Sequence, residues 1–252
     1  MRATILGLVH GSVADPHIES RLERNTYPAI DATAYEGLDG GAIYAGTAAA
    51  ELDRERPSVY VTESGIHTED VETELLTETV VTEWIGDLST DGGTGWLGVD
   101  SSDGDWLFEA LGGAKGVEIL RGRIDVDAFG EYLDDYPTAS AWNVTQSREF
   151  DQDGDSEEAT IDYHDAAHLG DVQNAAETSM LGFRYHWGDR YVRGVIAASG
   201  YVAVFDGPDA PKAYAEFIDS EVLPFASLPE EYQGTFADIR DTGDQEVEAD
   251  GE

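Results

Sequence analysis

The sequence lacks cysteine and is poor in lysine. None of its 252 residues is cysteine, which excludes disulfides, thiolate nucleophiles and cysteine-ligated zinc or iron–sulfur sites. Lys115 and Lys212 are the only lysines among 14 basic residues, so the rest are arginines. No apolar run approaches the ~20 residues of a membrane span, and the apolar residues 5–9 are too few for a secretory signal. We therefore expect a cytoplasmic protein that does not enter a membrane.

The net charge is the strongest compositional signal. The 53 acidic residues outweigh the basic ones and give a formal charge of −39. Self-repulsion of this size strains a fold at low salt but is screened in molar salt, where the Debye length is ~3 Å. Because the acids are spread along the whole chain, the composition favours a salt-in halophile of archaeal type. A DNA mimic and a cation-binding protein are the alternatives. Under the halophile interpretation, acidic motifs lose most of their diagnostic value.

The length corresponds to ~1.7 average domains, and 41% hydrophobic residues argue against general disorder. We expect an α+β fold, namely a mostly antiparallel, curved sheet of hairpins and meanders backed by helices. Residues 1–75 are expected to form an N-terminal α/β segment and residues 76–240 a sheet-and-helix domain. Residues 241–252 contain six acids and one valine and are expected to form a disordered acidic tail.

Local patterns predict most of the elements. Strands are expected at residues 3–9, 41–45, 75–88, 95–100 and 141–145, and a polar loop at residues 151–158. Helices are expected at residues 47–56, ended by Pro57, at residues 106–111, ended by Gly112 and Gly113, and at residues 124–136. A further helix is expected to open at Asp209 and Pro211. The five tryptophans are expected in the core.

Two segments share one plan. Residues 94–111 and 199–217 both read Thr/Ser-Gly-aromatic, an alternating strand, an Asp-Gly turn and an apolar-faced helix. A strand and a turn precede each of them. The pattern indicates two related β–β–α halves.

The segment around residues 183–193 predicts a hairpin with Gly188 and Asp189 as its two-residue turn. Such a turn sets Arg184 opposite Arg193, and His186 opposite Tyr191. The period of two assigns Phe183, Tyr185, Trp187, Val192 and Ile196 to the core, and leaves Arg184, His186, Tyr191 and Arg193 together on the other face.

Three arginines within ten residues invert the charge of the chain locally. This face is a candidate site for an anion or a nucleic acid, with arginine on phosphate and with Tyr191 and His186 stacked on bases. The alternative is that carboxylates of neighbouring strands neutralise the arginines. Arg121 and Arg123 lie two residues apart on an extended segment and can join either arrangement.

A histidine–carboxylate run offers a candidate metal site. His164 and His168 are four residues apart, which places both on one side of a helix, and Asp162 lies beside them. The spacing is that of the HExxH motif, but aspartate replaces the glutamate that serves there as general base. The alternative is a polar loop. Residues 151–155 (DQDGD) begin like a calcium loop, although Ser156 stands where such a loop needs glycine.

Three functions follow. The first is a non-enzymatic binding or regulatory protein that presents the arginine–aromatic hairpin to an anionic partner such as nucleic acid. The second is a structural or interaction subunit of a larger assembly with a protein partner. The third is a metal-dependent hydrolase centred on His164 and His168. The first is favoured because its cationic face runs against the bias of the chain, and it needs neither a cofactor nor a catalytic residue.

Overall fold

The structure is a computed structural model of the whole chain. It describes residues 2–11, 13, 15–16, 28–37, 41–57, 60–62, 65–67, 73–88, 95–100, 103–152, 155–164 and 177–228. Within these ranges, only the backbone is described for residues 55–74 and 147–177.

One antiparallel sheet organises the chain. Its strands follow the order β11-β10-β12-β13-β14-β1-β7-β6-β3-β2, and β8 also pairs with β1. The bounds of these strands are β1 Arg2–His10, β2 Ala29–Glu36, β3 Ala42–Pro57, β6 Thr73–Asp87, β7 Gly95–Asp100, β8 Glu118–Arg121, β10 Ser140–Gln152, β11 Asp155–His164, β12 Glu177–Trp187, β13 Arg190–Ala197 and β14 Tyr201–Asp206. Two small pairs lie outside this sheet, β4 (Tyr60–Thr62) with β5 (Gly65–His67) and β9 (Arg123–Ile124) with β15 (Ala226–Ser227).

β1 is the central strand of the sheet. Along one edge it pairs antiparallel with β7, from Thr4 to Val9. Along the other edge it pairs with β14 through Arg2–Ile5 and with β8 through Gly7–His10. Residues 4–9 are all buried. The apolar run of the first strand is therefore explained by burial on both faces, where alternation is not required.

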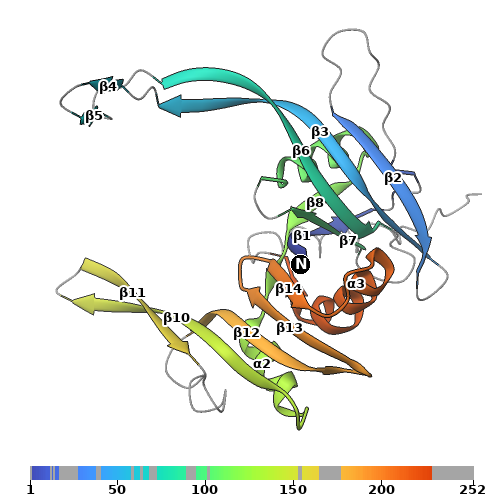
Figure 1. Ribbon diagram of the computed structural model, residues 1–252, viewed down its shortest axis with the longest axis vertical. Coiled ribbons are helices and arrows are strands. Elements are labelled where there is room, and N and C mark those ends of the chain that lie inside the picture. The colour runs from blue at the N-terminus through green and yellow to red at the C-terminus, as the bar shows by residue number, and fades with distance from the viewer. Residues whose placement is uncertain are drawn as a thin grey trace, which may run out of the picture.

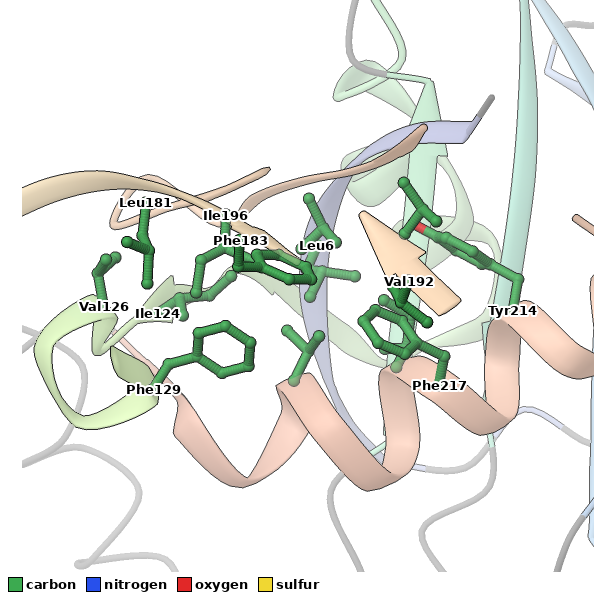
Figure 2. Close-up of a cluster of buried hydrophobic side chains, with 14 of the residues drawn as sticks. Leu6, Ile124, Val126, Phe129, Leu181, Phe183, Val192, Ile196, Tyr214 and Phe217 are labelled. Carbon is green, nitrogen blue, oxygen red and sulfur yellow. The ribbon is translucent and has the colours of Figure 1, made fainter. Parts of the chain in front are cut away.

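The sheet separates two hydrophobic cores. The first core lies against α2 (Val126–Asp134) and α3 (Pro211–Phe217) and contains Leu6 and Leu8 of β1. Figure 2 shows this first core, with Phe129, Phe183 and Phe217 directed toward one another. The second core lies against α1 (Trp106–Lys115) and contains Ile5 and Val9 of β1. Alternate residues of β1 thus supply both cores.

Local signals explain where the helices begin and end. The Asp125 carboxylate accepts a hydrogen bond from the Ala128 amide at 2.9 Å and caps α2. α1 continues past Gly112 and Gly113 to Lys115 and ends at Gly116, whose φ of 72° suits a glycine. The expected end at Gly112–Gly113 was therefore too early. α3 begins at Pro211 and continues as a π-helix, η2 (Ile218–Val222), and a 3-10 turn, η3 (Leu223–Phe225).

The two segments with a shared plan occupy comparable places. β7 and β14 lie on opposite sides of β1, both antiparallel to it, and each is followed by a helix. α1 covers one face of the sheet and α3 covers the other. A rotation of 180° about the axis of β1 would bring β7 to the side of β14, and it would bring the face covered by α1 to the face covered by α3. Both segments belong to one continuous sheet.

Two long hairpins extend from the sheet. β3 and β6 pair from Ile43–Asp87 out to Pro57–Thr73, and β10 and β11 pair from Asn143–His164 out to Gln152–Asp155. Figure 1 shows both hairpins reaching to the same side of the molecule.

These hairpins correct two expectations. Residues 47–56 belong to β3 and are not helical, because they pair with β6 throughout and with β2 as far as Ala49. This pairing outweighs the helix propensity of the alanines. Of the expected loop at residues 151–158, residues 151–152 and 155–158 are strand instead, because Asp151 pairs with Ser156 inside the β10–β11 hairpin.

The other expectations have varied outcomes. The sheet is antiparallel and dominates the fold, with few helices beside it. The boundary predicted at residues 75/76 lies within β6, and the strands on its two sides share one sheet.

The acidic tail at residues 241–252 lies outside the described residues. Among the described helices, none combines the length and the apolar character that crossing a bilayer requires.

The central position of β1 predicts that its side chains dominate stability. Leu6 has no exposed surface, whereas Leu75 on β6 is 65% exposed. Leu6→Ala should lower the free energy of unfolding by about 2–5 kcal/mol through lost burial and a residual cavity. Leu75→Ala should change it by less than about 0.5 kcal/mol. Denaturant titration in molar salt measures both, and equal effects would contradict the assignment of β1 as the core strand.

Candidate functional site

The β12–β13 hairpin has the predicted register. Trp187 pairs with Arg190, His186 with Tyr191, and Arg184 with Arg193. Gly188 opens the turn with a φ of 61°, a backbone conformation that favours glycine. The expected positions of this hairpin are therefore confirmed.

Its two faces differ sharply in exposure. Phe183, Tyr185, Val192 and Ile196 are completely buried in the first core, and Trp187 is half-buried beside them. Arg184, His186, Tyr191 and Arg193 are exposed on the opposite face. We call this second set the outer face of the hairpin.

Two β-bulges add aromatic rings to the outer face. In β10 the register passes from Ala141–Phe183 to Asn143–Gly182, so Trp142 is the extra residue. In β14 it passes from Val204–Gly194 to Asp206–Arg193, so Phe205 is the extra residue. Bulges re-aim side chains in this way. The Trp142 and Phe205 rings lie 6.1 Å apart, and both side chains are half-buried.

Trp142 was expected in the core, and this expectation was wrong. Its indole N–H donates to the Phe183 carbonyl oxygen at 3.1 Å, and its ring lies over Gly182. Neither Trp142 nor Phe205 had been placed beside the arginines. The only local signal was the period of two, which puts Phe205 on the face opposite to the buried Val202 and Val204.

The aromatic rings hold one arginine in place. The Arg193 guanidinium carbon lies 4.8 Å from the Trp142 ring centre and 5.9 Å from the Phe205 ring centre. Such cation–π contacts fix the orientation of the guanidinium while its charge stays exposed. Arg184 is positioned separately, because its Nε donates to the Ser140 hydroxyl at 2.7 Å. His186 and Tyr191 pack edge to face, with ring centres 5.7 Å apart.

Carboxylates do not neutralise these arginines within the described part of the chain. There, neither Arg184 nor Arg193 has a carboxylate oxygen within 4.0 Å of a guanidinium nitrogen. Asp206 is the cross-strand neighbour of Arg193, and Asp189 lies in the turn. Both arginines are thus exposed and form no ion pair with a described residue.

Arg121 and Arg123 are exposed but lie elsewhere. Arg121 Nε donates to the Ser199 carbonyl oxygen at 2.8 Å, in the turn after β13. Arg193 lies four strand residues, about 13 Å, before Ala197, where β13 ends and this turn begins. Arg123 pairs with Ser227 in the β9–β15 ladder. The structure does not bring this pair to the outer face.

The candidate metal residues are only partly described. Asp162 and His164 lie near the end of β11, in extended chain opposite Thr145 and Asn143. His168 lies outside the described residues. Where side chains are described, no three histidine, aspartate or glutamate residues gather as metal ligands. The hydrolase hypothesis therefore stays a prediction without a geometry to support it.

A buried cluster of one carboxylate and two phenols was not expected from the sequence. Glu221 of η2 is 5% exposed, and its Oε2 accepts hydrogen bonds from Tyr185 at 2.7 Å and Tyr132 at 3.0 Å. Burial is the main cause that raises the pKa of both phenols, and the bond to Glu221 adds to it. The phenols therefore remain donors, and the cluster ties η2 to β12 and α2.

The alternative of an assembly subunit calls for a broad exposed apolar patch. Among the described residues, the large exposed apolar side chains are Leu75, Leu76, Val81 and Tyr191. The first three lie on the β6 arm, where Leu76 faces the opposite way to Leu75 and Val81. They do not form one broad patch.

Comparison with known protein families finds no family model that matches the chain, and comparison with curated proteins finds no match. The function must therefore be argued from the residues of the chain itself.

The position of Trp142 predicts that Gly182 has no tolerance for a side chain. A Cβ at residue 182 would lie 2.8 Å from the Trp142 ring. Gly182→Ala should therefore lower the free energy of unfolding by about 1–3 kcal/mol. Gly113→Ala is the matched control, because nothing lies within 4 Å of a Cβ there, and it should stabilise α1 by about 0.5–1 kcal/mol. Thermal melts in molar salt distinguish the two, and a neutral Gly182→Ala would contradict the placement of Trp142.

Proposed function

We propose that this protein is a non-enzymatic binding or regulatory protein, adapted to molar salt, that holds an anionic partner on the outer face of the β12–β13 hairpin. The single observation that carries the proposal is the pair Arg184 and Arg193, exposed side by side without a carboxylate partner among the described residues. In a chain with charge −39, acids are available to neutralise almost any arginine. Among the described residues no carboxylate forms an ion pair with either of these two arginines, which supports a surface kept open for an external anion.

The two arginines also repel each other. Like charges directly opposite on neighbouring strands destabilise a hairpin unless other groups stabilise those charges. The Trp142 and Phe205 rings stabilise Arg193, and the Ser140 hydroxyl positions Arg184. An oxyanion between the guanidinium groups removes the remaining repulsion through charge-assisted hydrogen bonds.

A phosphate polymer fits this chemistry best. Arginine presents several N–H donors in a planar fork that matches phosphate oxygens. The aromatic rings beside the arginines offer further contacts that salt does not screen. Nucleic acid therefore remains the leading candidate for the partner.

Removing the two charges should weaken binding strongly. The Arg184→Gln/Arg193→Gln double variant should bind inorganic polyphosphate or an oligonucleotide at least about 100-fold more weakly, since charge-assisted hydrogen bonds contribute roughly 1.5–3 kcal/mol each. The Arg121→Gln/Arg123→Gln variant removes the same charge at a distant position and should bind like the unmodified protein. Fluorescence anisotropy over a range of KCl concentrations gives both affinities. Equal losses in the two variants would show a general charge effect and refute the proposed site.

A further inference from the structure

Building on the proposed function, we infer that the partner is a single-stranded nucleic acid whose unpaired bases stack on Tyr191 and on the Arg193 guanidinium. The argument rests on the order of side chains along the outer face and on the exposure of their planar groups.

The outer face alternates cations and rings in a small grid. Arg184 lies opposite Arg193, and His186 lies opposite Tyr191. Along β13, Tyr191 and Arg193 are two residues apart, which is about 7 Å. A strand laid along β13 thus meets planar groups and phosphate donors within the same few nucleotides.

Planar surfaces are available at both positions. Tyr191 is a large aromatic residue that is 44% exposed. The rings of His186 and Tyr191 contact each other edge to face. Arg193 is an exposed residue, and its guanidinium rests on the Trp142 ring. A base placed on that guanidinium extends a stack that already contains an indole. Arginine planes and aromatic rings are the surfaces on which single-stranded bases stack.

Salt makes stacking necessary. For a single strand, the logarithm of affinity falls with the logarithm of salt concentration with a slope of about −0.7 per neutralised phosphate. Two arginines give about −1.4, so a tenfold rise in salt costs about 25-fold in affinity. A surface that used its two arginines alone would retain little affinity in molar salt. Stacking is worth about 5- to 150-fold in affinity per base and restores it.

Base stacking also excludes a duplex. In a double helix the faces of each base are covered by its neighbours, so Tyr191 and Arg193 would reach only phosphates and groove edges. Unpaired bases expose the faces that the outer face is built to contact. The same argument disfavours an acidic polypeptide, which carries anionic groups without rings.

The experiment compares ligands that share phosphates but differ in bases. Fluorescence anisotropy in molar KCl would measure binding of oligothymidine, an abasic oligonucleotide of the same length, a duplex, inorganic polyphosphate and polyglutamate. We expect oligothymidine to bind most tightly. Tyr191→Ala should weaken it by about 5- to 150-fold, whereas Tyr191→Phe keeps the ring and should bind normally. Tyr191 is exposed, so the alanine variant should fold, and a thermal melt checks this.

The outcomes separate this inference from the proposed function. If the abasic strand, the duplex or polyglutamate binds as tightly as oligothymidine, the inference is overturned while the outer face remains an anion site. An unchanged affinity in Tyr191→Ala overturns it as well. If none of these anions binds at any salt concentration, the proposed function itself fails.

Discussion

The burial of β1 on both faces and along both edges is the constraint on which the structure depends. Its residues alternate between the first core and the second core. One of its edges pairs with β7, and the other pairs with β14 and β8. Each half of the sheet is therefore anchored to the same nine residues. Beyond the ends of their neighbouring strands, the β3–β6 and β10–β11 hairpins continue as two-stranded arms that extend away from the cores (Figure 1).

The candidate site follows from how this sheet is covered. α2 and α3 bury one face of the β12–β13 hairpin, and α1 covers the opposite face of the sheet in the other half, around β1 and β7. The outer face of the hairpin is left to solvent. Bulges on the two flanking strands then turn Trp142 and Phe205 onto it, and Gly182 leaves room for the indole to lie flat. The site therefore belongs to four strands rather than to the hairpin alone.

Two ionisable side chains of this acidic chain, Arg193 and Glu221, are held by aromatic residues. With 53 acidic and 14 basic residues in the chain, acids are the background and arginines are the informative residues. The Arg193 guanidinium lies against the Trp142 and Phe205 rings, and no carboxylate among the described residues forms an ion pair with it. The buried Glu221, held by the phenols of Tyr132 and Tyr185, shows the same preference inside the core. In both places aromatic residues hold the ionisable group, through ring faces for Arg193 and through phenol hydroxyls for Glu221.

The sequence by itself determined features that depend on short-range periodicity. The Gly188-Asp189 turn and the period of two were sufficient for the register of β12–β13 and for the separation of Tyr185 from Arg184. Pro211 and the spacing of Tyr214, Phe217 and Val222 identified the α3 region, because helix signals are equally local. Only the tertiary structure decided features that depend on partners distant in the chain. β3 is a strand because β2 and β6 pair with it, and Trp142 lies on the outer face because a bulge forms opposite β12. Long-range pairing sets these features, and no local pattern contains the position of the partner strand.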